Sequence, residues 1–398
     1  MFTNEYGPFL LALIFLLLLL LGALVRIWKP WMRVGMRDDS LLTDSEIDDA
    51  DQEEPQKPDG PKLTVIVYAE NGEEDIERCV EILEAQDYSN KEIVVVCRAT
   101  AENRELISGR LSGHENVYVT FIPPGTHNLS ERKLAITLGL KAATGDIVLT
   151  TAVNVRPASD HWLSAMATPF SDPAIEIVTG YSHMDFSELR GPGRWYRQFD
   201  SVMTAGLWIG SALAGHPYRG DGFNLAFRRS TFFEHKGYAR NMFLHYGDDD
   251  LFVNEIACAD NSAMVLDQAA IVTTEWGPIA NRVWTLRKSR YNFTSRWLPQ
   301  GPFIRASLLS WCNWLLTICA VAMCLIGFPD WAFIAYAAQV WLIAELFQIL
   351  YYRRLAARLQ AVRLWWAVPL FLLIHPVLNF IFRLSHRSLR KMNYTWQR

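Results

Sequence analysis

Three consecutive aspartates, Asp248, Asp249 and Asp250, are the residues of this chain whose type and spacing most directly suggest chemistry. Adjacent carboxylates repel one another, and this repulsion raises the proton affinity of the cluster. A carboxylate with a raised proton affinity is suited to take a proton from an acceptor hydroxyl group. The structural alternative is an acidic loop that caps a helix, because apolar residues follow at helical spacing from Leu251.

The composition and charge of the chain exclude some classes of function. Of its 398 residues, 51% are hydrophobic, which is enough to bury at least one full-sized core. The net charge is −4, with acidic residues concentrated in 38–60 and basic residues beside the apolar segments. No basic patch with interleaved aromatic residues occurs in the sequence, so nucleic acid is not an expected partner. The six cysteines lack the spacing of a metal or redox site.

Apolar segments at both ends predict an integral membrane protein, with the lipid bilayer as a partner. Residues 9–25 are almost purely apolar and are close to the length of one transmembrane span. Arg26, Lys29, Arg33 and Arg37 follow this segment, which is the positive-inside pattern of an uncleaved anchor. The same rule places the main part of the chain in the cytoplasm.

Three further apolar segments lie near the C-terminus. Residues 306–328 and 331–350 predict two spans with a short turn between them. Residues 364–382 are also apolar, but they contain two prolines and precede a basic tail. A full span would place this tail outside, against the positive-inside rule. For this last segment we therefore expect a re-entrant or interfacial hairpin.

A carboxylate lies within the second of these C-terminal spans. Glu345 stands between Gln339 and Gln348 in an otherwise apolar segment. An ionisable residue inside a membrane is costly and is functional by default. Glu345 is also close to the cytoplasmic end of the span, so an interfacial position without a function is the alternative.

Strands and helices alternate in the region between the apolar ends. Runs rich in β-branched residues are separated by helical stretches from residue 62 onward. Such alternation produces right-handed βαβ units and a parallel sheet, in which ligands bind beyond the carboxyl ends of the strands. The predicted strands are 63–68, 92–97, 117–122 and 146–151, and the predicted helices are 73–86, 101–111 and 130–143.

The chain therefore divides into four predicted parts. Residues 1–37 form an N-terminal transmembrane anchor. Residues 38–61 are acidic, contain few large apolar residues and form a disordered linker. Residues 62–300 form a cytoplasmic α/β domain, and residues 301–398 form the C-terminal membrane helices and a basic tail.

Several phrases of the sequence, in order, resemble the membrane-anchored family-2 glycosyltransferases of GT-A fold, particularly those of Bacteroidetes. The phrases are KLAITLGLKAATGD, RPASDHWL, EIVTGY, ALAGHPYRGDGFNLAFRRS and GDDDLFVNE, and the resemblance covers roughly residues 62–300. It implies an α/β fold with a parallel-dominated sheet. It also implies inverting transfer of a sugar from a nucleotide-sugar donor to a lipid-linked or polysaccharide acceptor. The expected location is the cytoplasmic face of a bacterial cytoplasmic (inner) membrane.

The resemblance assigns roles to residues of this chain by position. An acidic loop supplies the base in the family, which makes Asp248 the expected base here and Asp249 the reserve. A DxD motif holds a divalent metal ion on the leaving diphosphate in the family, but Ala152-Val153-Asn154 stands at that position here. The expected donor-binding residues are Glu70, Asn71, Arg98, Lys133, Asn154, Arg287 and Arg290, and the expected acceptor-side residues are Trp195, Asp221, Gly222 and Asn224.

The altered DxD position leaves two functions open. In the first, the enzyme works without a metal ion, and basic side chains neutralise the diphosphate. These are Arg98 and the segment Arg287-Lys288-Ser289-Arg290-Tyr291, which stands at the position of the family's QxxRW motif. In the second, the chain is a pseudoenzyme that serves as a scaffold or binding subunit, with another membrane protein as its partner. No metal ligand set is expected in either case.

Overall fold

The fold is that of a computed structural model of the chain, which describes residues 3–36, 60–69, 75–98, 101–123, 125 and 130–385. These residues divide into two compact units, each of which is described by itself. The sheet unit comprises Arg37–Arg194 and Ala212–Leu298, and the helix unit comprises Met1–Met36, Trp195–Ser211 and Pro299–Ser385. Residues 195–211, which lie within the predicted α/β domain, are thus part of the helix unit.

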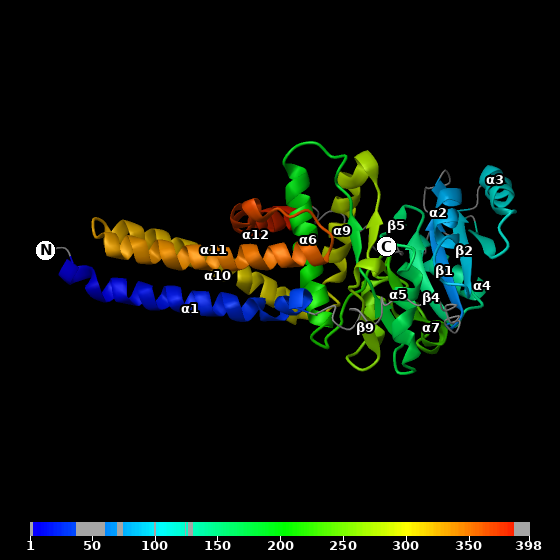
Figure 1. Cartoon of the computed structure of the whole chain (residues 1–398), viewed down its shortest axis with the longest axis horizontal. Coiled ribbons are helices and arrows are strands. Elements are labelled where there is room, and N and C mark those ends of the chain that lie inside the picture. The colour runs from blue at the N-terminus through cyan, green and yellow to red at the C-terminus, as the bar shows by residue number, and fades with distance from the viewer. Residues whose placement is uncertain are drawn as a thin grey trace, which may run out of the picture. The chain divides into compact units, whose positions relative to one another are not determined.

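A seven-stranded sheet forms the centre of the sheet unit (Figure 1). Its strands are β1 (Leu63–Ala69), β2 (Lys91–Arg98), β3 (Val117–Ile122), β4 (Ile147–Ala152), β6 (Ile177–Thr179), β8 (Leu225–Arg228) and β9 (Ser262–Met264). The strand order is β3-β2-β1-β4-β8-β6-β9. Strands β3, β2, β1 and β4 run parallel to one another. Strand β8 is antiparallel to its neighbours β4 and β6, and β9 is parallel to β6. The prediction of a parallel-dominated sheet is confirmed, and its four predicted strands match β1 to β4.

Strand β1 is buried along its whole length, which shows that both faces of the sheet are covered. Val65 and Val67 belong to the core on one face, and Ile66 and Tyr68 belong to the core on the other. This division follows from the two-residue repeat of a strand. The helices that contribute to these two cores are α2 (Ile76–Glu84), α3 (Ala101–Leu111), α4 (Glu131–Ala142), α5 (Trp162–Ala167), α7 (Arg229–Glu234) and α8 (Asp250–Ile256).

A second, three-stranded sheet has the order β5-β10-β7, and its strands alternate along the chain with the last strands of the main sheet. Its strands are β5 (Val155–Pro157), β7 (Ser182–Met184) and β10 (Val272–Thr274), and the helix α9 (Ala280–Thr294) comes after them. Short 3₁₀ segments connect these elements at Thr168–Ser171, Ala239–Asn241, Gln268–Ala270 and Gly277–Ile279. Residues of β5, β7 and α9 line one cavity together with residues at the carboxyl ends of β1 and β4.

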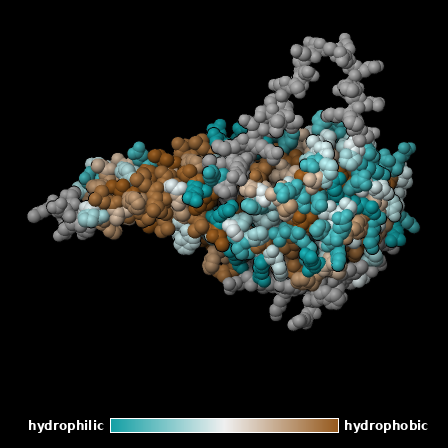
Figure 2. Space-filling model, turned by 90° about the horizontal axis from the view of Figure 1, so that it is seen from below, coloured by the Kyte–Doolittle hydropathy of each residue, from teal (hydrophilic) through white to brown (hydrophobic). Residues whose placement is uncertain are grey.

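The helix unit contains five helices: α1 (Thr3–Met36), α6 (Gly193–Ala212), α10 (Gln300–Gly327), α11 (Trp331–Arg358) and α12 (Val368–Ser385). In Figure 1, α1, α10 and α11 run side by side, and each of them contacts the other two. Four segments, Gly7–Lys29, Gln300–Gly327, Trp331–Arg358 and Trp365–Ser385, are long and apolar enough to cross a membrane. Hydrophobic residues dominate the visible surface of these helices, whereas hydrophilic residues dominate that of the sheet unit (Figure 2).

The hairpin expected at residues 364–382 is not formed. After a short 3₁₀ segment at Trp365–Ala367, the chain continues as the single helix α12. Pro369 lies in the first turn of this helix, where a missing N–H costs no hydrogen bond. Pro376 lies inside the helix, and in the same stretch the indole of Trp314 donates a hydrogen bond of 2.9 Å to the carbonyl oxygen of Leu373. Two prolines were thus a weak signal for a chain reversal.

Candidate active site

A cavity of about 680 Å³ opens in the sheet unit beyond the carboxyl ends of β1 and β4. Tyr68 of β1 and Ala152 of β4 line it, together with Val153 and Asn154, which follow β4. Its position is the one predicted for a ligand of a parallel sheet. Charged side chains of both signs surround it: the arginines are Arg78, Arg132, Arg156, Arg282, Arg287 and Arg290, and the carboxylates are Asp75, Asp221, Asp248, Asp249, Asp250 and Glu275.

The aspartate triplet reaches this cavity at the start of α8, and its three carboxylates have different surroundings. Asp250 is 1% exposed and accepts a hydrogen bond from the hydroxyl group of Thr294. The guanidinium of Arg219 lies 3.7 Å from the same carboxylate and is also buried. Burial raises the pKa of Asp250, and Arg219 and Thr294 oppose this rise. Asp250 therefore ties α8 to α9 inside the protein.

Asp248 forms an ion pair with a side chain that the sequence analysis did not select. Its Oδ2 atom lies 2.5 Å from the Nε atom of Arg132, which stands in the first turn of α4. Arg132 also donates a hydrogen bond of 2.8 Å to the carbonyl oxygen of Gly222, and its guanidinium lies over the ring of Phe223. The only sequence signal for this role was the position of Arg132 beside Lys133 in a predicted helix.

Asp249 is half-buried and caps the N-terminus of α8. Its Oδ1 atom accepts a hydrogen bond of 2.7 Å from the N–H of Asp250, and its Oδ2 atom accepts one of 3.3 Å from the N–H of Gly222. Burial, followed by the charges of Asp248 and Asp250, raises the pKa of Asp249 to about 7. Asp249 thus combines contact with the cavity, partial exposure and a raised proton affinity, which a general base requires.

Two of the expected acceptor-side residues, Gly222 and Asn224, have structural roles. A Cβ atom on Gly222 would lie 2.6 Å from the guanidinium of Arg132 and 3.2 Å from the Cβ atom of Asp249, so a larger residue would have to displace the Arg132 side chain. Asn224 is fully buried, accepts a hydrogen bond from the Trp162 indole and donates to two backbone carbonyl groups. Asn224 is a structural residue and does not line the cavity.

Asp221 holds Arg287 at the wall of the cavity. The Oδ2 atom of Asp221 lies 2.9 Å from the Nη2 atom of Arg287 and accepts hydrogen bonds from the N–H and the hydroxyl group of Ser182. Its Oδ1 atom accepts a hydrogen bond from the N–H of Phe223 at 3.2 Å. Arg287 in turn donates a hydrogen bond of 3.1 Å to the hydroxyl group of Tyr291. Asp221 therefore orients Arg287 through a buried network of hydrogen bonds.

Three other arginines differ from Arg132, Arg156 and Arg287, each of which is held in an ion pair. No carboxylate among the described residues lies within ion-pair distance of Arg78, Arg282 or Arg290. The guanidinium of Arg290 lies 4.9 Å from the ring centre of Tyr246, which also lines the cavity. Arginine donors of this kind bind phosphate oxygens through charge-assisted hydrogen bonds. Arg78, Arg282 and Arg290 are therefore the candidates for binding phosphate oxygens in a cavity that also holds six carboxylates.

Arg98 and Trp195, which were expected on the donor side and the acceptor side respectively, do not line this cavity. Glu70 and Asn71 are outside the described residues. Arg98 is exposed, forms an ion pair with Glu131 and does not line the cavity. Trp195 belongs to the helix unit, where its ring packs edge-on against Trp366 at 5.2 Å. Of the expected donor residues, Asn154, Arg287 and Arg290 line the cavity.

Lys133, which was also expected to bind the donor, is turned into the protein. Its side chain is 4% exposed, and its Nζ atom donates hydrogen bonds to the carbonyl oxygens of Asn241 and Leu244 at 2.6 and 3.0 Å. Burial lowers the pKa of Lys133 to about 8, while the three aspartates of the triplet oppose this decrease. Lys133 thus fixes the loop that leads into the triplet.

We expect Lys133→Met to destabilise the protein by about 1–3 kcal/mol, because buried carbonyl groups lose a charged donor. The melting temperature of the full chain measures this loss. Lys141→Met is the matched control, since Lys141 is exposed on the same helix and should have little effect. Equal melting temperatures for Lys133→Met and the unaltered protein would show that these hydrogen bonds contribute nothing.

The residues at the position of the DxD motif do not fit a divalent metal ion. Asn154 is the single polar side chain there, and its amide group donates to the carbonyl oxygen of Glu275 at 3.2 Å. Among the described residues, no group of three or more His, Cys, Asp and Glu side chains is arranged to hold a metal ion. Hard cations require several oxygen ligands. Metal-independent binding stays a prediction, and the chemistry proposed below uses no metal ion.

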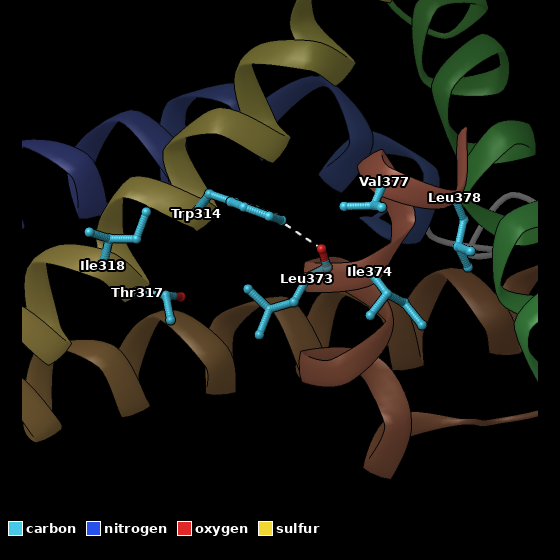
Figure 3. A pocket seen from close by; sticks show the side chains of 7 residues that line it. All are labelled: Trp314, Thr317, Ile318, Leu373, Ile374, Val377 and Leu378. Carbon is cyan, nitrogen blue, oxygen red and sulfur yellow. Dashed lines mark hydrogen bonds between the residues drawn. The ribbon is translucent and has the colours of Figure 1, made fainter. Parts of the chain in front are cut away.

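The helix unit has a cavity of its own, of about 590 Å³, between α10 and α12 (Figure 3). Trp314, Thr317 and Ile318 of α10 face residues 373, 374, 377 and 378 of α12 across it. None of these side chains is ionisable. The acid–base chemistry of the chain is therefore expected in the cavity of the sheet unit.

Comparison with known proteins identifies the fold. No family model matches the sequence, and no curated protein matches it. A mannosyltransferase from Pyrobaculum calidifontis, solved in complex with GDP-Man and Mn²⁺, matches with a TM-score of 0.51 and 19% sequence identity over 88% of this chain and 99% of that one. Glucosyl-3-phosphoglycerate synthase from Mycobacterium tuberculosis matches at a TM-score of 0.35 and 16% identity over 58% of this chain and 80% of that one. The match to the mannosyltransferase gives the chain a GT-A-like α/β fold, which is combined with apolar helices, as its sequence predicted.

Proposed function

We propose that this protein is a membrane-bound glycosyltransferase that transfers a sugar from a nucleotide-sugar donor to a lipid-linked or polysaccharide acceptor. One observation carries the proposal: Asp249, with its raised pKa, borders an arginine-rich cavity at the carboxyl ends of parallel strands. A nucleotide sugar brings a diphosphate, and its transfer to a hydroxyl group needs a base. The cavity offers chemistry for both requirements.

The donor diphosphate is proposed to bind on the basic side of the cavity. Arg290 and Arg282 stand on α9 without a carboxylate partner among the described residues, and Arg287 is oriented beside them by Asp221. Their guanidinium groups supply the positive charge that a metal ion would otherwise provide to the leaving diphosphate. Lys288 is on the same helix, but its ammonium group lies over the ring of Trp284.

Asp249 is the proposed base. Its carboxylate takes the proton of the acceptor hydroxyl group while the acceptor oxygen attacks the anomeric carbon. The new bond joins this oxygen to the anomeric carbon, and the bond between that carbon and the diphosphate oxygen breaks, with its electron pair leaving on the diphosphate. Attack from the side opposite the leaving group inverts the anomeric centre. Asp248, the base expected from the resemblance, is occupied by Arg132, so our proposal reverses the order of the two candidates.

The pH dependence of transfer is expected to report the pKa of Asp249. A base acts only when it has lost its proton, so kcat/KM should fall about tenfold for each pH unit below the pKa of about 7 and should level off above it. Asp248→Asn removes a neighbouring charge that raises this pKa, so the acidic limb should move to lower pH. A rate that is independent of pH between 5 and 8 would contradict the assignment.

Binding of nucleoside diphosphates with and without EDTA tests donor binding directly. We expect UDP or GDP to bind equally well in both conditions, because arginines and not a metal ion hold the diphosphate. Arg290→Ala should weaken binding by about 1.5–3 kcal/mol, the contribution of a hydrogen bond to a charged group. Arg98→Ala is the matched control, since Arg98 does not line the cavity and should leave binding unchanged.

The other outcomes of this titration distinguish metal-independent donor binding from metal-dependent binding and from the pseudoenzyme. Binding that requires a divalent metal ion would show that ligands outside the set described above replace the DxD pair. No binding of any nucleoside diphosphate would support the pseudoenzyme, whose partner would then be another membrane protein. For either function we propose the bacterial cytoplasmic membrane as the location, with the sheet unit on the cytoplasmic side, because Arg26 and Lys29 lie at the end of the first candidate span.

A further inference from the structure

The helix unit buries a carboxylate that the proposed transfer reaction does not use. Glu345 lies within the candidate span Trp331–Arg358 of α11 and is 3% exposed. Neither of its carboxylate oxygens has a hydrogen-bond partner among the described residues. The position is therefore inside the helix packing and not at an exposed interface. A buried ionisable group without a partner is costly, so its retention requires a physical explanation.

Two buried amide side chains lie on the same helix pair. The Nε2 atom of Gln348 on α11 donates a hydrogen bond of 3.0 Å to the Oδ1 atom of Asn313 on α10. The indole of Trp341 on α11 donates to the hydroxyl group of Thr317 on α10 at 3.3 Å. Glu345 follows Trp341 by four residues and precedes Gln348 by three, so all three lie on one face of α11. Glu345 therefore lies on the face of α11 from which Trp341 and Gln348 contact α10.

The surroundings offer no positive charge to an ionised Glu345. Among the described residues of the helix unit, no Lys, Arg or His side chain is buried. His375 on α12 is partly exposed and pairs with Asp200 of α6 at 3.0 Å. The buried titratable groups on α10 and α11 are Cys319, Tyr351 and Tyr352, and the buried positions of α1 are the apolar residues Leu10, Leu13, Leu17, Leu20, Leu24 and Trp28. An unpaired buried charge is far more costly than a neutral carboxyl group.

The amide groups of Asn313 and Gln348 each have one buried polar atom without a hydrogen-bond partner among the described residues. The Nδ2 atom of Asn313 is a buried donor without an acceptor, and the Oε1 atom of Gln348 is a buried acceptor without a donor. A protonated carboxyl group has one O–H donor and one carbonyl acceptor. One proton on Glu345 gives it one donor and one acceptor, which complement the acceptor of Gln348 and the donor of Asn313. A carboxylate has no donor for Gln348 and leaves that atom unsatisfied.

We propose that Glu345, Asn313 and Gln348 form a proton-binding site in the helix unit. In this site a neutral Glu345 hydrogen-bonds to both amides and stabilises the packing of α11 against α10. The ligand of this site is a proton. The rival ligand is a small monovalent cation such as Na⁺, which would be held by oxygens of Glu345 and Gln348. The two ligands differ in whether Glu345 keeps its proton, and this difference can be measured.

Infrared difference spectroscopy of the full chain in lipid nanodiscs tests the proposal. The spectrum of the unaltered protein minus that of Glu345→Gln at pH 7 should contain the carbonyl band of a protonated carboxylic acid. Asn313→Leu should shift this band, because it removes the donor to the carbonyl oxygen. Carboxylate bands in place of the carboxylic acid band would overturn the proposal.

Melting temperatures in Na⁺ and in choline buffers provide a second measurement. Glu345→Gln should melt at the temperature of the unaltered protein in both buffers, because its amide group can make the same two hydrogen bonds as the neutral acid. Glu345→Leu should melt at a lower temperature, since it leaves both amides unsatisfied. Gln339→Leu, an exposed change on the same helix, is the matched control and should have no effect. A melting temperature that rises with Na⁺ and loses this dependence in Glu345→Gln would identify a cation site and overturn the proton site.

Discussion

The Asp249→Asn variant is expected to lose sugar transfer by about 10²–10⁴-fold, the usual contribution of a general base. The amide keeps the size of the side chain and its acceptor oxygen, so the cap on α8 and the fold should be retained. Nucleoside diphosphate binding should also be retained, because the arginines on α9 are untouched. The measurement is the transfer rate at saturating donor, with melting temperature and nucleotide affinity recorded for the same preparation.

Asp248→Asn is the comparison that distinguishes the two neighbouring carboxylates. This variant loses the ion pair with Arg132 but keeps the proposed base, so its transfer rate should exceed that of Asp249→Asn. A lower rate in Asp248→Asn than in Asp249→Asn would show that Asp248 is the base, as the resemblance alone predicts. Loss of nucleotide binding in either variant would instead assign the affected aspartate to donor binding.

The largest effect on stability is expected for Asp221→Ala. Asp221 is 1% exposed and accepts hydrogen bonds from Ser182, Phe223 and Arg287. Its removal leaves the largely buried guanidinium group of Arg287 without its carboxylate partner. Breaking a buried ion pair on one side costs about 3–5 kcal/mol. Arg287 also loses its orientation at the cavity, so the affinity for nucleoside diphosphate should fall. Melting temperature and nucleotide titration measure the two effects separately.

Glu131→Ala, which removes an ion pair at the surface, is the matched control for Asp221→Ala. Glu131 pairs with Arg98, and both side chains are substantially exposed, at 31% and 53%. Removal of an exposed pair costs about 1 kcal/mol or less, because water screens the charges. Similar melting temperatures for Asp221→Ala and Glu131→Ala would mean that the network around Asp221 does not stabilise the fold.

The sheet was predictable because its signals are local. Strands β1 to β4 are short runs of β-branched and apolar residues between helical stretches, and such periodicity needs no knowledge of distant residues. The apolar helices were predictable for the same reason. The prediction for residues 364–382 failed because it weighed proline and basic residues, whereas α12 accommodates Pro369 in its first turn and Pro376 in its interior.

The roles of single residues were less predictable, because side-chain direction depends on packing. Lys133 and Asn224 occur in phrases that resemble a glycosyltransferase, yet both are buried and support the backbone. Arg132 stands beside Lys133 in the sequence, but only Arg132 reaches the cavity. Neighbours on a helix point about 100° apart, so a one-residue difference decides which side chain enters a site.

The sequence by itself determined that this protein has a parallel-dominated α/β sheet, apolar helices near both ends and an acidic triplet after the four predicted strands, because composition and periodicity are local properties. Only the tertiary structure decided how the triplet is used. It pairs Asp248 with Arg132, buries Asp250 against Thr294 and Arg219, and leaves Asp249 beside Gly222 at the cavity. The pKa of a carboxylate depends on burial and on charges brought from distant parts of the chain, and these are fixed only when the chain has folded.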